Sequence, residues 1–256
     1  MAYLIMSESW NIDKIDSLFI AKHILEKLGK DWDKSAVNNA RKSLGSKVLE
    51  VVNSIEEMEE NWEYKAGPSE HTFGRKEENE TIKLWSVPRK SAEVLRNLVM
   101  LTKSKNILEI GTSAGYSTLF LADAAKQNNG NVVTVELLAE KAELARNFFR
   151  DSNLGNIILL ESEASETLAN WDAGAVDFVF LDADKENYGK YLDLLLPLMK
   201  TGAIIVADNV NDYGHLMEDY LQKVNGTHLS QSRADKRVRS YYIAALDNGL
   251  IITTKL

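Results

Sequence analysis

From residue 87 to the end of the chain, short apolar runs alternate with longer segments of helical periodicity. The apolar runs are 107–110, 132–135, 157–160, 176–181 and 203–207. The helical segments around them are 88–103, 116–126, 138–150 and 187–199. Strands that alternate with helices predict a parallel, doubly wound α/β sheet. The run 176–181 is almost wholly apolar, which is typical of a strand buried on both faces.

The last two apolar runs, 241–246 and 250–254, are separated only by Asp247-Asn248-Gly249. Asn-Gly between two strands is a strong signal for a hairpin. We therefore expect the last strand to run antiparallel to its neighbour.

The first 84 residues show helical periodicity without alternating strands. Apolar positions predict one helix that stops near Gly29 and a second helical run through 36–55. This run ends in the acidic stretch 56–60, which we interpret as a solvated helix face. A loop with glycine and proline follows over 67–80.

The composition fits a helical extension, 1–84, followed by one α/β domain, 85–256. The chain has 256 residues and is 45% hydrophobic, which is enough to bury a sizeable core. Its net charge of −8 argues against nucleic acid as the main partner, because phosphate contacts need clustered Lys and Arg.

The absence of cysteine excludes disulfides, thiolate catalysis and Cys-ligated zinc. We see no signal peptide and no membrane span, and we expect a cytoplasmic protein.

The turn Gly111-Thr112-Ser113-Ala114-Gly115 lies between a predicted strand and a predicted helix. Glycines there let the backbone approach a ligand, and the helix N-terminus offers free N–H groups. The G-x-G-x-x-G of dinucleotide-binding folds is absent. The turn does match the G-x-S-x-G of serine hydrolases, with Ser113, Asp182 or Asp208, and His215 in the right chain order. Against this alternative, the chain has no HGGG-like oxyanion segment.

A nucleoside-binding turn is the competing interpretation, and Glu136 supports it. This residue ends the strand that follows the turn in the chain. A carboxylate at that position can accept both ribose hydroxyls. It can equally serve as a carboxylate at a helix N-terminus, which the helix dipole favours.

Polar side chains follow two further predicted strands. Asp182, Asp184 and Lys185 come after one strand, and Asp208 and Asn209 after the next. Ligands in open α/β sheets bind outside the carboxyl ends of the strands, where Asp182, Asp208 and Asn209 can converge. Hard oxygen donors suit Mg²⁺, Mn²⁺ or Ca²⁺ better than zinc. Asp after a strand is also common as a helix cap or turn former.

Together these segments resemble the cation-dependent O-methyltransferases of the catechol and caffeoyl-CoA type. The match covers roughly 87–256 and rests on LEIGTSAGYSTLFLA, VVTVE, DFVFLDADKENY, GAIIVADNV and the closing hairpin. The resemblance implies a Rossmann-like doubly wound methyltransferase sheet of seven strands, the last antiparallel, with an N-terminal helical extension. It also implies metal-dependent transfer of a methyl group from S-adenosylmethionine (SAM) to a hydroxyl of a small molecule with vicinal, catechol-like oxygens. Mg²⁺ is the first choice of cation, with Mn²⁺ or Ca²⁺ as alternatives.

The resemblance assigns chemical roles to four residues. Lys185 would lie beside the reacting oxygen, and with Asp182 it forms the expected catalytic pair. Asp182, Asp208 and Asn209 would be the metal ligands.

The resemblance also implies a set of cofactor-binding residues. Glu136 would hold the ribose, the Ala164 backbone would lie beside the adenine, and Asp184 would bind the methionine ammonium. The full expected set is Val87, Glu109, Gly111, Thr112, Ser117, Glu136, Ala164, Asp182 and Asp184. The chain departs from the family at the segment Glu161-Ser162-Glu163-Ala164, where Gly-Asp-Ala is common.

Two questions about this site stay open: whether a second subunit borders it, and whether its substrate is a small molecule or tRNA. The first 84 residues match nothing that can be aligned, and in this family that region shapes the acceptor site and often a dimer contact, so we expect a homodimer. Some relatives of the same fold methylate tRNA, and Arg233, Lys236, Arg237 and Arg239 form a local basic cluster. The cluster fits a solvated or dimer-facing loop as well.

Overall fold

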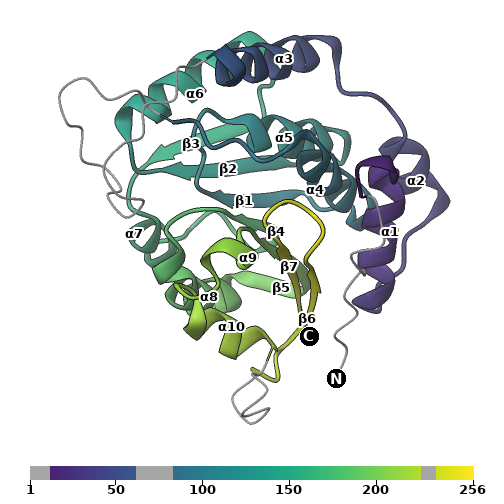
Figure 1. The fold of residues 1–256 in the computed structure, drawn as a ribbon, viewed down its shortest axis with the longest axis vertical. Coiled ribbons are helices and arrows are strands. Elements are labelled where there is room, and N and C mark those ends of the chain that lie inside the picture. Colours follow the sequence, from purple (N-terminus) through teal and green to yellow (C-terminus); the bar gives the residue numbers. More distant parts are fainter. Residues whose placement is uncertain (1–11, 62–82, 226–234) are drawn as a thin grey trace.

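The computed structural model describes residues 12–61, 83–225 and 235–256. Seven strands in these segments form one sheet in the order β3-β2-β1-β4-β5-β7-β6 (Figure 1). The strands are β1 (Asn106–Ile110), β2 (Asn131–Glu136), β3 (Ile157–Glu161), β4 (Val176–Leu181), β5 (Met199–Ala207), β6 (Val238–Ile243) and β7 (Leu250–Lys255). The first five pair in parallel, and β7 runs antiparallel to both β5 and β6. The predicted doubly wound sheet with an antiparallel last strand is confirmed.

Helices cover both faces of the sheet (Figure 1). One face carries α4 (Arg89–Thr102), α5 (Tyr116–Gln127) and α6 (Ala139–Ser152), and the other carries α7 (Ala164–Ala169), α8 (Tyr188–Leu198) and α10 (Glu218–Asn225). Alternate residues of each central strand enter different cores: Phe178 packs with the first group of helices and Val179 with the second. This explains why β4 has no polar face.

The N-terminal region forms α1 (Ser17–Lys27), α2 (Lys34–Ala40) and α3 (Ser46–Asn61) after a short 3-10 turn, Ile12–Lys14. The single helical run expected over 36–55 is wrong, because the chain leaves the helix between α2 and α3. Tertiary hydrogen bonds hold this break: Arg96 donates to the Ala40 carbonyl, and the Gly45 N–H donates to Asp123. Arg96 and Asp123 form a buried ion pair of 2.8 Å, which anchors the break on α4 and α5.

The acidic stretch at the end of α3 is only partly a solvated face, which corrects the interpretation from the sequence. Glu56 accepts two hydrogen bonds from Arg89, of 2.9 and 2.7 Å, and one from the Tyr116 hydroxyl. Glu59 accepts the backbone N–H of Ser86 at 3.0 Å. These contacts hold α3 against the segment before α4 and the first turn of α5.

The hairpin is also looser than the Asn-Gly pair predicts. Strand β6 ends at Ile243, so residues 244–249 connect it to β7. The backbone N–H groups of Val210 and Asn211 donate to the carbonyls of Gly249 and Asn248, at 3.0 and 2.7 Å. The connection is therefore bonded to the start of α9 (Val210–Tyr213) and does not close as a tight two-residue turn.

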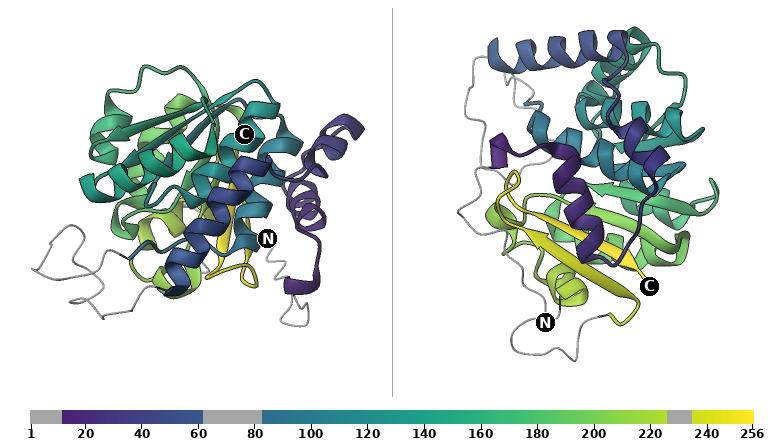
Figure 2. Two further views of the ribbon diagram at one scale, coloured as in Figure 1. Left: turned by 90° about the horizontal axis from the view of Figure 1, so that it is seen from above. Right: turned by 90° about the vertical axis from the view of Figure 1, so that its right-hand side faces the viewer.

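Helix α1 lies beside the hairpin, far away in sequence (Figure 2). Nε2 of His23 lies 3.2 Å from the Tyr241 hydroxyl, and the two rings meet edge to face. The N-terminal decapeptide and the loop expected over 67–80 lie outside the described residues. None of the described helices has the length and apolar character needed to cross a membrane.

Candidate active site

The connection from β1 to α5 carries the glycine turn. Gly111 and Gly115 adopt φ angles of 100° and 86°, which favour glycine. A Cβ on Gly111 would lie 1.9 Å from the carbonyl oxygen of Asp182, and one on Gly115 would lie 2.3 Å from the Phe149 ring. The first glycine is therefore required by the close approach of the β1 and β4 ends.

Glu109 is fully buried directly below this turn. It accepts hydrogen bonds from the hydroxyls of Ser117 and Thr134, each at 2.6 Å, and from Thr118. Burial raises the pKa of Glu109 to about 7; the three hydroxyls oppose the shift, and the charge of Asp182 adds to it. Of the expected cofactor residues, Glu109 and Ser117 thus form a buried network that supports the turn from beneath.

Glu136 ends β2 at the level of the turn. One of its oxygens accepts the Ser113 N–H at 2.8 Å, and the other accepts the Leu138 N–H at 2.9 Å. The carboxylate therefore ties the glycine turn to Leu138, the residue that precedes α6. Each oxygen keeps a lone pair for a further donor. The Ser162 N–H donates to the Glu136 carbonyl at 3.0 Å, which brings the approach to Ala164, the first residue of α7, beside the same strand end.

Lys185 is held at the carboxyl end of β4. Its Nζ lies 2.7 Å from Oδ1 of Asp182 and 2.9 Å from the Tyr188 hydroxyl. Tyr188 is buried and donates its own proton to the Leu181 carbonyl at 2.9 Å. Burial, together with Asp182 and Asp208, raises the pKa of Tyr188 well above its ordinary value. The lysine is thus oriented by the core and by Asp182.

Asp208 lies next to Asp182 because the ends of β4 and β5 are paired. The Asp208 N–H donates to the Leu181 carbonyl at 3.1 Å, and its carboxylate accepts the Asn209 N–H at 2.6 Å. Burial raises the pKa of Asp208 well above its ordinary value, and the negative charges of Asp182 and Asp247 raise it further.

The donor set fits a hard divalent cation in its chemistry. Asp182, Asp208 and Asp247 are oxygen donors near enough for Asp182 and Asp247 to raise the pKa of Asp208, with Lys185 as the cation that opposes this shift. Oxygen donors with surplus negative charge suit Mg²⁺, Mn²⁺ or Ca²⁺. In the part of the chain that the structure describes, no three acidic or histidine side chains are grouped closely enough to hold a metal ion by themselves.

Asp247 is the functional candidate at this edge that the sequence reasoning missed. Burial raises its pKa to about 6, and Asp182 contributes to the shift. Its Oδ2 is buried with no hydrogen-bond partner among the described residues. The pairing of β5 with β7 could have identified Asp247. Ala207 pairs with Ile251, so the loop that precedes the antiparallel strand β7 lies beside Asp208.

A family of proteins described as O-methyltransferases has a sequence profile that matches residues 71–256, more than half of the chain. The chain belongs to the O-methyltransferase family. A catechol O-methyltransferase of Niastella koreensis is 36% identical over 138 residues, and one of Mycobacterium tuberculosis is 38% identical over 118 residues. These matches cover 52% and 46% of this chain, and 62% and 53% of the relatives, which is less than two thirds of either relative.

Solved structures of other O-methyltransferases share the fold. The enzyme from Bacillus cereus, in complex with SAH, is 24% identical with a TM-score of 0.61, over 84% of this chain and 93% of that one. TomG from Streptomyces achromogenes, in complex with SAM, is 21% identical with a TM-score of 0.63, over 88% and 96% of the two chains. The Rossmann-like methyltransferase fold expected from the sequence is confirmed.

Other expected cofactor residues of this family member already have partners in the structure or are buried. Both oxygens of Asp184 accept hydrogen bonds, from the Tyr191 hydroxyl at 2.5 Å and from Asn187. Thr112 directs its hydroxyl to Thr134, 2.6 Å away. Val87 is buried in the segment before α4. The side chains of Asp184 and Thr112 therefore already have protein partners.

The serine hydrolase alternative finds no support among the described residues. The Ser113 hydroxyl donates to the Leu84 carbonyl, and its N–H donates to Glu136. His215 is exposed between α9 and α10. The Ser113 hydroxyl is therefore bonded to a backbone carbonyl and not to the histidine that a triad would need.

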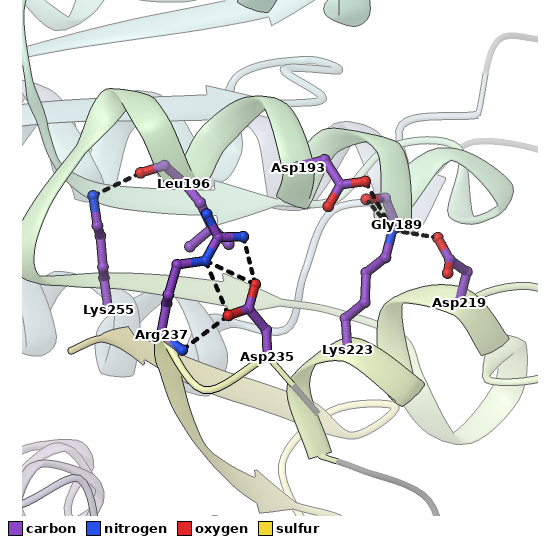
Figure 3. Close-up of polar contacts among 8 residues, drawn as sticks. All are labelled: Gly189, Asp193, Leu196, Asp219, Lys223, Asp235, Arg237 and Lys255. Atoms are coloured by element: carbon purple, nitrogen blue, oxygen red, sulfur yellow. Dashed lines mark hydrogen bonds and ion pairs between the residues drawn. The ribbon is translucent and has the colours of Figure 1, made fainter. Parts of the chain in front are cut away.

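One member of the basic cluster near β6, Arg237, is neutralised by an acidic neighbour (Figure 3). Arg237 donates to both oxygens of Asp235, and Arg239 donates to the Leu28 carbonyl at 3.4 Å. Nearby, Lys223 forms ion pairs with Asp193 and Asp219, of 2.9 and 2.7 Å. Arg233 lies outside the described residues. In the described part of the cluster, Arg237 is therefore paired with an acid, whereas Lys236 and Arg239 are exposed.

An open cavity of about 740 Å³ lies at the opposite edge of the sheet, at the amino ends of β4 and β5. Its charged walls are paired with one another: Lys103 with Asp33, and Lys200 with Asp177. Ligands of open α/β sheets bind at the carboxyl ends of the strands. We therefore assign the chemistry to the edge with the glycine turn.

Proposed function

We propose that this protein transfers the methyl group of SAM to a hydroxyl of a small molecule with vicinal oxygens, assisted by a divalent cation. The observation that carries the proposal is the arrangement of Lys185, Asp182 and buried Asp208 at one edge of the sheet. The same edge carries the glycine turn, at which Gly111 approaches the Asp182 backbone. The turn that would bind the cofactor therefore lies next to the residues that would carry out the transfer.

The cofactor half of the site consists of the turn and Glu136. In this proposal Glu136 accepts the two ribose hydroxyls through the lone pairs that its bonds to Ser113 and Leu138 leave free. Gly111 packs directly against the Asp182 backbone, so no side chain at this position separates the turn from the end of β4. Ser162, which follows β3, donates its N–H to the Glu136 carbonyl, and the nearby Ala164 backbone would lie beside the adenine.

The acceptor half consists of Asp182, Asp208 and Asn209, which would hold the cation. A bound divalent cation would lower the pKa of a chelated hydroxyl and fix two neighbouring oxygens in place. The contribution of the chain is the buried carboxylate of Asp208, whose raised pKa reflects burial and two nearby negative charges.

Lys185 would take the proton of the reacting hydroxyl. Two of the three directions around its Nζ are used by Asp182 and Tyr188, which leaves the third for the acceptor. In the transfer, the O–CH₃ bond forms as the S–CH₃ bond breaks, and the neutral amine of Lys185 accepts the hydroxyl proton. The products are the methyl ether and the demethylated cofactor. Holding the oxygen, the sulfonium carbon and the base in one geometry is a large part of such catalysis.

The acceptor class draws on the names of the relatives from Niastella koreensis and Mycobacterium tuberculosis, both catechol O-methyltransferases. Methylation of tRNA is the second candidate. It is less favoured because Arg237 is paired with Asp235 and the net charge of the chain is −8.

The test is a transfer screen with SAM labelled in its methyl group. The acceptors are catechols, other vicinal diols and total tRNA, each with Mg²⁺, Mn²⁺ or excess chelator. The proposal expects label in a vicinal diol only when the cation is present. Label in tRNA alone, or full transfer to diols under chelator, would contradict it.

A further inference from the structure

Lys141 is a buried cation at the border of the proposed cofactor site that the account above does not use. It occupies the third position of α6 and is 6% exposed. Its Nζ lies 4.6 Å from the centroid of the Trp85 ring. Among the described residues the ammonium has no hydrogen bond or ion pair, so its three N–H donors are not satisfied by the described protein.

This position is unfavourable for a lysine in two ways. Burial lowers the pKa of Lys141, which means that the surroundings disfavour its charge, although Glu136, Asp182 and Glu59 counteract the shift. The side chain also belongs to the first turn of α6, where the helix dipole already places positive charge. An ammonium and a helix N-terminus together form a site that favours an anion.

The neighbours of Lys141 place it beside the cofactor. The carboxylates that act on it belong to Glu136, the proposed ribose acceptor, and to Asp182. The aromatic face that it contacts belongs to Trp85, next to Leu84, whose carbonyl accepts the hydroxyl of Ser113 in the glycine turn. The ammonium therefore contacts the segment that precedes α4 and lies within electrostatic reach of the carboxylates at the ends of β2 and β4.

Only one part of the cofactor has the charge to satisfy this ammonium. Adenine and ribose are neutral, whereas the sulfonium and the α-ammonium are positive and would be repelled. We propose that Lys141 binds the α-carboxylate of the cofactor, with Trp85 positioning the lysine by a cation–π contact. This inference rests on the proposed function and adds a residue to its cofactor site.

The competing role for Lys141 is indirect: it could neutralise Glu136 and thereby act on ribose binding. Two ligands separate the roles. S-adenosylhomocysteine (SAH) carries the nucleoside and the amino-acid carboxylate, whereas 5′-methylthioadenosine carries the same nucleoside without the carboxylate. A carboxylate-binding lysine affects SAH alone, and a lysine that acts through Glu136 affects both ligands.

The experiment is calorimetric titration of both ligands into the wild type, Lys141→Met and Lys126→Met. Lys126 is an exposed lysine in the last turn of α5 and serves as the control. For Lys141→Met we expect SAH affinity to fall about 10-fold or more and 5′-methylthioadenosine affinity to change less than about 2-fold. Lys126→Met should leave both unchanged. An equal loss for the two ligands, or no loss of SAH affinity, overturns the inference.

Folding is measured on the same samples. Met removes a desolvated charge from the helix N-terminus, so Lys141→Met should unfold at the same temperature as the wild type or higher. Lys141→Gln provides a second neutral variant if Met disrupts packing, and the same ligand preference is expected of it. A wild type that binds neither ligand overturns the proposed function itself, whereas a wild type that binds both while Lys141→Met and Lys141→Gln bind SAH normally overturns only the role of Lys141.

Discussion

Lys185 and Asp182 form an ion pair at the carboxyl end of β4, with 2.7 Å between Nζ and Oδ1. The lysine side chain is 10% exposed and the aspartate 20% exposed, so water screens the pair only in part. The same ammonium donates to Tyr188, whose hydroxyl is fixed on the Leu181 carbonyl. The geometry therefore holds the nitrogen at the strand end, where a substrate oxygen would arrive.

Replacing Lys185 with Met tests whether this nitrogen serves the chemical step. We expect the maximal transfer rate to fall about 10²–10⁴-fold, because the base is lost while most of the stem stays. Cofactor affinity and the unfolding temperature should change little. Tyr188→Phe keeps the amine and removes one of its partners, so its loss of rate should be smaller. Wild-type turnover of Lys185→Met between about pH 6 and 9 would exclude Lys185 as the base.

Asp208→Asn tests the proposed cation site with a readout that does not depend on activity. Because burial and nearby negative charge raise the pKa of Asp208, the neutral amide should leave the metal-free protein at least as stable as the wild type. Added Mg²⁺ should raise the unfolding temperature of the wild type through binding to the folded state, and should not raise that of the variant. Equal shifts in both proteins, or no shift in the wild type, would argue against the site.

The raised pKa of Glu109 predicts that the free energy of unfolding depends on pH. Its pKa is raised from 4.5 to about 7 in the folded protein, so the folded state holds the proton more tightly than the unfolded state. This contribution to the free energy of unfolding is fully present below about pH 4.5 and is lost as the pH rises through about 7. A shift of this size corresponds to roughly 3 kcal/mol.

The measurement for Glu109 is urea unfolding of the wild type and Glu109→Gln at several pH values between about 5 and 8. The wild type should lose stability relative to the variant across this window, because the amide cannot ionise. Parallel curves for the two proteins would show that Glu109 does not titrate there.

Much of the fold and the outline of the site could be predicted from local sequence. The apolar run of β4 and the glycine turn before α5 are short-range signals, since burial on both faces and positive φ select residue types directly. Asp182 and Asp208 could be placed at one edge because parallel strands end together. Their proximity then appears in the hydrogen bond from the Asp208 N–H to Leu181.

What local patterns could not predict depends on long-range contacts. The break between α2 and α3 is anchored by Arg96 and Asp123. Both residues lie more than 50 positions further along the chain than the break itself. Asp247 resembles an ordinary turn residue until the register of β7 places it beside Asp208. Lys141 resembles a solvated helix lysine until Trp85, over 50 positions earlier, covers it. The short helix α7 was also missed, because a run of six residues carries too little periodicity.

The central claim is that SAM binds at the turn with its ribose on Glu136, and calorimetric titration of SAH into Glu136→Ala tests it most directly. The control is Glu161→Ala, because Glu161 pairs with Glu136 in the register of β2 and β3 but is exposed. We expect the wild type and Glu161→Ala to bind SAH alike. Glu136→Ala should lose about 1–3 kcal/mol of binding free energy, since two ribose hydroxyls lose their acceptor. Unchanged affinity in Glu136→Ala, or no binding to the wild type, would contradict the account.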